Sequence, residues 1–299
     1  MRIWNRRDFL QTSAVASAFA TSSLTHLFDK SRPLSKKSLK YGMIKGGDTV
    51  LEKFQMAKAA GFHGVELNYP HELKDEEILE AKKITGLEIP GVVNSKHWKS
   101  PLSDPDPAVR KICTDSMIDA LYACKKYGGT TVLLVPAVVN AEISYAEAWD
   151  RSVVEIEKML PIAQETGIKI ALENVWNNFL LSPLEAVRYI DQFNSNMLGW
   201  YMDIGNVIRY GWAEHWIEAL GSRIMKIDVK EYSRKLQKEE GVWEGFKVKI
   251  GDGDCNWAAV NAALAKVGYG GEWGSAEVPG GDQDRLNDIS ERMDKVYAL

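Results

Sequence analysis

The sequence alternates between short runs rich in β-branched and apolar residues and longer segments with helical periodicity. This alternation restricts the fold more than any other feature. The expected strands are 39–44, 64–68, 88–94, 131–136, 169–174, 198–203, 224–230 and 271–277. A repeated order of strand, helix and strand is typical of parallel strands joined by crossover connections. The chain is therefore predicted to belong to the α/β class.

The intervening segments carry the marks of amphipathic helices. The clearest is 105–127, where apolar residues recur three and four positions apart. Candidate N-caps precede three helical segments, at Asp48, Ser144 and Ser182. Candidate helix ends are marked by Gly61, Gly128, Gly167 and Gly268.

An open, doubly wound sheet is the main alternative to a closed barrel. It would place a glycine-rich phosphate loop, G-x-G-x-x-G, after the first strand. Residues 42–48 instead read Gly-Met-Ile-Lys-Gly-Gly-Asp, which does not fit that pattern. Eight strand-helix units in about 260 residues match the size of a (β/α)8 barrel. We therefore predict a single (β/α)8 TIM barrel over residues 39–299.

The first 38 residues differ from the rest of the chain. Arg6 and Arg7 precede Phe-Leu and a short apolar stretch, and residues 18–20 have the small-x-small form of a cleavage site. This arrangement resembles a twin-arginine export signal, with 31–38 as a linker. The apolar stretch is shorter than the roughly 20 residues of a membrane helix. We expect a periplasmic or otherwise exported protein without a stable membrane span after cleavage.

Net charge separates the same two parts. Residues 1–38 carry seven Lys or Arg and two Asp, so the remainder holds a formal charge of −9 in a chain whose total is −4. An acidic domain argues against a nucleic-acid partner, which usually meets a basic patch. The cysteines, Cys113, Cys124 and Cys255, are interpreted as small buried hydrophobic residues.

Carboxylates occupy the ends of several expected strands, where the active sites of this fold lie. They are Glu66, Glu173, Asp203, Asp228 and Glu277. The last four must face one mouth of a closed barrel, where like charges raise one another's pKa unless a cation is present. Their all-oxygen donor set suits a hard ion, so Mn²⁺ or Mg²⁺ is expected rather than Zn²⁺.

Five motifs in order resemble the sugar phosphate isomerase/epimerase-like barrels of the xylose-isomerase-like superfamily. They are Leu172-Glu173-Asn174, Asp203-Ile204-Gly205-Asn206, Ile227-Asp228-Val229-Lys230-Glu231, the segment Gly251 to Trp257, and Gly268-Tyr269-Gly270-Gly271 with Ala276-Glu277. The resemblance covers residues 39–299. This group includes ketose 3-epimerases and hydroxypyruvate isomerases.

In epimerases of this family, the metal ligands are Glu, Asp, His and Glu on strands five to eight. The resemblance carries these roles to Glu173, Asp203 and Glu277, but Asp228 stands where the histidine is usual. Asn206 also replaces a common histidine and can donate a hydrogen bond without carrying charge. A fourth carboxylate lowers the Lewis acidity expected of the ion.

The resemblance and the carboxylates together predict a metal-dependent isomerase or epimerase that acts through an enediolate. Glu173 and Glu277 would form the acid/base pair. The substrate is expected to be an unphosphorylated sugar or keto-sugar, since no basic cluster or glycine-rich anion loop follows the strands. The expected substrate-binding residues are Glu66, His97, Trp176, Asn206 and Arg234, with Trp98 and Trp273 as further stacking candidates.

Several alternatives stay open. A 3-keto-glycoside lyase or deglycosidase would use the same metal and bases to release an aglycone, and a non-catalytic sugar-binding barrel would explain the loss of both family histidines. A DNA repair nuclease is disfavoured by the acidic charge and the export signal. His97 is either a site residue or a loop histidine packed beside Trp98. A homo-oligomer is compatible with the sequence.

Overall fold

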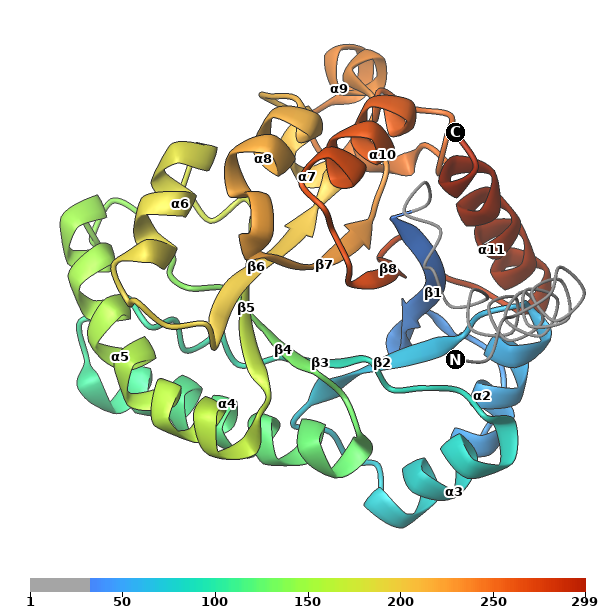
Figure 1. Ribbon diagram of the computed structural model, residues 1–299, viewed down its shortest axis with the longest axis horizontal. Helices are drawn as coiled ribbons and strands as arrows, with labels where there is room; N and C mark the ends of the chain where they lie inside the picture. The colour runs from blue at the N-terminus through green and yellow to red at the C-terminus, as the bar shows by residue number, and fades with distance from the viewer. Residues whose placement is uncertain (1–32) are drawn as a thin grey trace, which may run out of the picture. The chain divides into compact units, whose positions relative to one another are not determined.

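Residues 33–299, which the computed structural model describes, form a closed barrel of eight parallel strands with helices around the outside (Figure 1). The strands are β1 (Leu34–Lys40), β2 (Gly64–Tyr69), β3 (Gly91–Asn94), β4 (Thr131–Leu134), β5 (Lys169–Glu173), β6 (Leu198–Asp203), β7 (Ile224–Val229) and β8 (Glu272–Ala276). Strands adjacent in the chain are adjacent in the barrel, and β8 pairs with β1 to close it. The predicted α/β class and single (β/α)8 TIM barrel are confirmed.

Helices follow the strands in regular alternation. They are α2 (Val50–Ala59), α3 (Asp75–Thr85), α4 (Pro107–Tyr127), α5 (Tyr145–Thr166), α6 (Pro183–Asp191), α7 (Ile204–Ile208), α8 (Ala213–Leu220), α9 (Arg234–Glu240), α10 (Trp257–Lys266) and α11 (Gln283–Tyr297). Short 3₁₀ helices are η1 (Tyr41–Met43), η2 (Gly221–Arg223) and η3 (Glu244–Lys247). Within residues 33–299, no helix has the length and apolar character needed to span a membrane.

Strand β1 corrects the sequence prediction. It begins at Leu34 rather than at residue 39, so residues 34–38, interpreted as a linker, belong to the barrel. Lysines hide its apolar pattern in the sequence. The ammonium of Lys37 lies 2.6 Å from the Asp294 carboxylate on α11, whereas Lys40 contacts buried carboxylates inside the barrel. The proposed export signal falls on residues 1–32, outside the described residues, and stays a prediction.

Local capping explains several helix boundaries. Helices α5 and α6 begin after Ser144 and Ser182, as predicted, and each serine forms a reciprocal capping box with a glutamate three positions on. Helix α2 begins after Thr49 rather than after the predicted Asp48, because Thr49 makes the capping box. Helix α4 is capped by Gly128, whose φ of 79° is a conformation that glycine adopts without strain.

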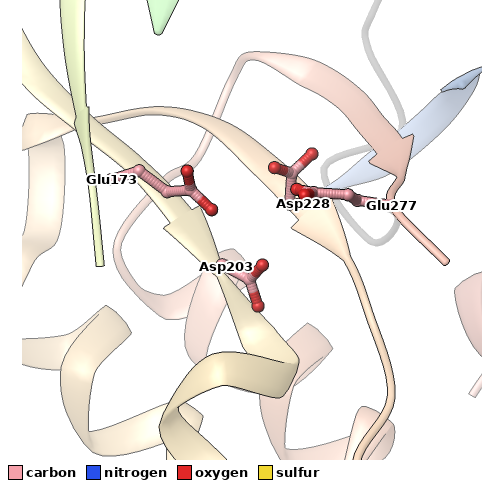
Figure 2. Close-up of side chains that lie close together, drawn as sticks. All are labelled: Glu173, Asp203, Asp228 and Glu277. Carbon is pink, nitrogen blue, oxygen red and sulfur yellow. The ribbon is translucent and has the colours of Figure 1, made fainter. Parts of the chain in front are cut away.

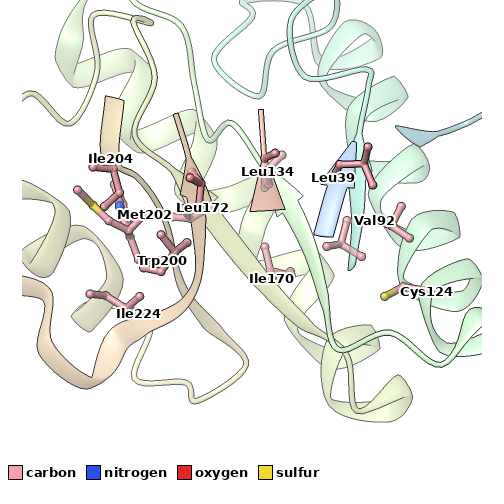
Figure 3. Close-up of a cluster of buried hydrophobic side chains, with 14 of the residues drawn as sticks. Leu39, Val92, Cys124, Leu134, Ile170, Leu172, Trp200, Met202, Ile204 and Ile224 are labelled. Atoms are coloured by element: carbon pink, nitrogen blue, oxygen red, sulfur yellow. The ribbon is translucent and has the colours of Figure 1, made fainter. Parts of the chain in front are cut away.

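The main apolar core lies between the strands and the surrounding helices. Figure 3 shows part of it, in which side chains such as Leu39, Val92 and Trp200 from the strands lie with Cys124 of α4. All three cysteines are buried and free, which confirms their interpretation as small hydrophobic residues. This packing leaves the other faces of the strands to line the interior of the barrel.

The barrel interior contains a buried ionic network centred on Glu66. Its Oε2 accepts hydrogen bonds from Lys40 Nζ at 2.7 Å, Tyr201 Oη at 2.9 Å and Ser275 Oγ at 3.0 Å. Its Oε1 lies 3.4 Å from Lys226 Nζ. Burial by itself would raise the pKa of Glu66, but Lys40 and Lys226 outweigh that effect and lower the pKa to about 2. The Glu66 carboxylate thus connects its own strand, β2, with side chains from β1, β6, β7 and β8.

Replacing Glu66 by glutamine should destabilise the fold strongly. The change leaves Lys226 buried without its carboxylate partner and Lys40 with Asp228 alone, which costs about 3–5 kcal/mol. Denaturant unfolding of the purified variant measures the loss. The matched control is Glu88→Gln, which removes an exposed partner of Lys36 and should change stability by less than about 0.5 kcal/mol. Equal losses in the two variants would contradict the central role of Glu66.

Candidate active site

Four carboxylates converge at the carboxyl-terminal mouth of the barrel (Figure 2). Glu173 and Asp203 are the last residues of β5 and β6, Asp228 lies one residue before the end of β7, and Glu277 directly follows β8. One oxygen from each lies within 4.8 Å of the corresponding oxygen of the other three. The predicted convergence is confirmed, whereas the role of these residues as metal ligands stays a prediction.

The donor set fits a hard divalent cation. Oxygens on opposite sides of a bound Mg²⁺ or Ca²⁺ lie about 4–5 Å apart, in line with the observed spacing. Glu173 Oε1 and Asp228 Oδ2 are buried and have no hydrogen-bond partner among residues 33–299. Burying a carboxylate oxygen without a partner is costly, and a cation would remove that cost. Because all four donors are carboxylates, Mn²⁺ or Mg²⁺ suits the site better than Zn²⁺.

Two lysines that the sequence analysis did not assign to the site contact this cluster. Lys230 Nζ lies 2.8 Å from Asp203 Oδ2 and 3.5 Å from Glu277 Oε1, and Lys40 Nζ lies 2.9 Å from Asp228 Oδ1. Four carboxylates and two lysines leave two formal negative charges, which is the charge that one divalent cation neutralises. The sequence does contain a signal for Lys230. It lies two residues after Asp228, and alternate positions along a strand point to the same face.

The two glutamates of the cluster have pKa values that move in opposite directions. Burial, followed by repulsion from Glu277 and Asp228, raises the pKa of Glu173 well above its usual range. Burial would also raise the pKa of Glu277, but Lys230 and Lys40 outweigh it and lower the pKa to about 2. Paired carboxyl groups whose pKa values are separated in this way suit the roles of acid and base.

A cavity of about 740 Å³ opens above the cluster. Glu173 and Glu277 line it, together with three predicted substrate-binding residues, His97, Trp176 and Asn206. The indole N–H of Trp176 donates to the Asn206 carbonyl oxygen at 2.8 Å. The structure therefore brings these three predicted residues to the same cavity as the acidic cluster.

His97 combines the two roles that the sequence left open. Its ring packs edge-on to Trp98, with centroids 5.7 Å apart, and it also lines the cavity. Its Nδ1 accepts a hydrogen bond from the Val135 N–H at 3.3 Å, so the neutral ring carries its proton on Nε2. Burial lowers the pKa of His97 to about 4, and this side chain is therefore a neutral donor at physiological pH.

Three other residues predicted to contact substrate lie elsewhere. Strand β2 continues to Tyr69, so Glu66 is not at a strand end and its carboxylate is taken up by the interior network. The Arg234 guanidinium donates to the carbonyl oxygens of Ile208 and Gly211, outside the cavity lining. Trp273 lies near the start of β8, where the Lys36 ammonium sits 5.2 Å from its ring centroid.

The segment Gly251 to Trp257 has a structural explanation in the loop before α10. The Glu231 carboxylate accepts hydrogen bonds from Gly251 N at 2.7 Å, Cys255 N at 2.9 Å and Trp257 Nε1 at 3.0 Å. A Cβ at Gly253 would lie 2.5 Å from Glu231 Oε1, so the close approach requires glycine there. These hydrogen bonds hold the loop before α10 against Glu231, the residue that follows Lys230.

A divalent cation should stabilise the metal-free protein. An ion that binds the native state alone at about 100 times its Kd adds about 2.7 kcal/mol, or roughly 5–10 °C in Tm. Thermal unfolding with and without Mn²⁺ or Mg²⁺ measures this shift. Asp203→Asn keeps the acceptor for the Asn206 N–H but removes a charge, and should reduce the shift. Glu218→Gln, which changes an exposed side chain of α8, is the control. Equal shifts in all three proteins would contradict the site.

His97 should contribute to acid sensitivity. The pKa of histidine is about 6.5 in an unfolded chain and about 4 at this position, so the unfolded state binds more protons between these values. Stability should therefore fall by roughly 3 kcal/mol as the pH drops from 6.5 to 4. His97→Asn retains an acceptor for Val135 and does not titrate. Unfolding measured at several pH values should show a flatter dependence in this variant, and parallel curves would contradict the assignment.

Comparisons with known proteins agree with this fold. The family described as Xylose isomerase-like TIM barrel matches residues 54–298. The L-ribulose-5-phosphate 3-epimerase UlaE of Escherichia coli strain K12 is 24% identical over 273 residues, covering 85% of this chain and 93% of that protein. The uncharacterized protein MJ1311 of Methanocaldococcus jannaschii is 27% identical over 184 residues, covering 58% of this chain and 60% of that protein.

Solved structures share the same architecture. An L-ribulose 3-epimerase has a TM-score of 0.74 at 16% identity, covering 89% of this chain and 95% of that one. The 3-keto-D-glucoside 4-epimerase YcjR of E. coli has a TM-score of 0.74 at 16% identity, with coverages of 88% and 99%. At these identities the likeness shows the fold. From the family match over residues 54–298, the chain belongs to the xylose isomerase-like TIM barrel family.

Proposed function

We propose that the protein is a sugar epimerase or isomerase that moves a proton on a carbon next to a carbonyl group. The observation that carries this proposal is the cluster of four carboxylates, three of them buried, at the base of a cavity of about 740 Å³. The relatives named as epimerases support it. Glu173, Asp203, Asp228 and Glu277 would hold the divalent ion, whose chemistry is to polarise a carbonyl oxygen and so acidify the neighbouring C–H.

The two glutamates that line the cavity would transfer the proton. Glu277 and Glu173 would remove and return that proton, one on each face of the carbon. The His97 N–H would hold a substrate hydroxyl. Lys230 Nζ lies 3.4 Å from Asn206 Oδ1, so these two side chains would orient the oxygens beside the reacting carbon.

The substrate we propose is unphosphorylated. Among the described residues that line the cavity, the cationic side chains are Lys40 and Lys230, and both are paired with carboxylates. A phosphate group would therefore meet no cation free to bind it. We also propose export, which rests on the N-terminal sequence alone.

A 3-keto-glycoside lyase is the second candidate, because the cavity has room for an aglycone and the same base could remove the required proton. Incubating the metal-loaded protein in deuterated water with free ketoses and 3-keto-glycosides, followed by NMR, separates the candidates. Deuterium uptake at one carbon without aglycone release supports an epimerase or isomerase. Aglycone release supports the lyase, and saturable binding without exchange supports a non-catalytic barrel.

Replacing Glu277 by glutamine should lower the rate of solvent exchange by about 10²–10⁴, because the variant keeps an oxygen ligand but loses the base. Metal content is measured in the same preparation, so that loss of the ion is not mistaken for loss of the base. Glu272→Gln, on the same strand but outside the cavity lining, is the matched control and should exchange normally. Full activity of a metal-replete Glu277→Gln variant would contradict the two-glutamate assignment.

A further inference from the structure

Two strongly exposed tryptophans border the cavity. Trp98 is 50% exposed and Trp243 is 66% exposed, and both belong to the cavity lining. An exposed indole leaves a large apolar surface in water, and aromatic side chains of this kind commonly contact ligands. Trp212 is similarly exposed, at 53%, but lies outside the lining with the Arg234 guanidinium over its ring. The pair Trp98 and Trp243 is therefore distinguished by its position.

The barrel topology puts these two side chains on opposite sides of the mouth. Trp98 lies in the loop after β3, and Trp243 lies between α9 and η3, in the connection after β7. Strands follow one another in order around the closed barrel, so β3 and β7 face each other across its axis. Two indoles that line one cavity from opposite strands can contact both faces of a flat ring held between them.

Packing gives the Trp243 side a rigid support. Its ring centroid lies 4.7 Å from that of Trp176 and 6.4 Å from that of Phe246, and Trp176 and Phe246 are themselves 4.8 Å apart. The Arg209 guanidinium lies 4.8 Å from the Trp176 ring centroid, which anchors the cluster further. A pre-packed aromatic surface loses little side-chain freedom when a ligand binds.

The cavity is divided between polar and aromatic ends. Glu173 and Glu277 of the acidic cluster lie at its base with Lys230 beside them, whereas Trp98 and Trp243 form its exposed border. A hexose has about twelve non-hydrogen atoms. Each occupies less volume than one water molecule in the liquid, which takes up about 30 Å³. A cavity of about 740 Å³ therefore accommodates about two such rings.

We propose that the substrate is a glycoside whose reacting sugar carries the carbonyl group and lies on the carboxylates, while a second ring lies between Trp98 and Trp243. The second ring must have a flat apolar face, as a second sugar or an aryl aglycone has. The inference rests on the proposed function and names its substrate class. It accounts for the two exposed indoles, which a single sugar at the base of the cavity would leave in water.

Isothermal titration of the metal-loaded protein with two matched pairs of ligands tests the proposal. D-Fructose is compared with maltulose, which is fructose carrying a glucose ring, and D-glucose is compared with phenyl β-D-glucopyranoside. The second ring should tighten binding at least about tenfold in one pair. Tightening in the first pair alone identifies a second sugar, and tightening in the second pair alone identifies an aryl group.

Variants locate the effect. Trp98→Ala and Trp243→Ala should each reduce the advantage of the two-ring ligand at least about fivefold, whereas Trp212→Ala should retain it. Equal affinities within both pairs, or an equal loss in the Trp212→Ala variant, would overturn the inference. Solvent exchange on a free ketose is measured in parallel. Exchange without any advantage for a second ring would overturn the glycoside proposal and leave the epimerase intact, whereas failure of every sugar to exchange would overturn the epimerase.

Discussion

Charge compensation inside the closed barrel is the constraint on which this structure depends. Glu66 is buried with two lysines, and Lys40 carries the network onward to Asp228 in the acidic cluster. A buried carboxylate or ammonium group that loses its partner strongly destabilises the fold. Each charged group in this network therefore depends on the neighbouring group of opposite charge. The interior of the barrel and the site at its mouth are consequently one electrostatic unit.

This unit sets the chemistry available at the mouth. Lys40 and Lys230 hold the pKa of Glu277 low, while burial and neighbouring carboxylates hold that of Glu173 high. Two carboxyl groups of the same type thereby acquire different proton affinities a few ångströms apart. The remaining negative charge matches a divalent ion, and the neutral His97 adds a hydrogen-bond donor without further charge. The proposed proton transfer on a sugar would use the two glutamates together with a polarising cation.

Sequence prediction succeeded where a residue's role follows from local order and failed where it follows from partners distant in the chain. The ends of β5 and β6 were predicted correctly, since short apolar runs end there in Glu173-Asn174 and Asp203. The start of β1 was missed because Lys36 and Lys37 look like linker residues until their partners, Glu272 on β8 and Asp294 on α11, are known. Arg234 was expected to bind substrate from the family resemblance, but its guanidinium donates to backbone carbonyl oxygens after β6.

The alternating architecture and the meeting of four carboxylates at one mouth follow from the amino-acid sequence, because parallel strands in order bring their ends together. The charges that compensate these carboxylates depend on contacts between distant parts of the chain. Lys40, on β1, reaches Asp228 on β7 only because the barrel closes, and no local pattern shows that contact. The same closure sets Trp98 across the mouth from Trp243, since opposition of two loops is a property of the whole ring of strands.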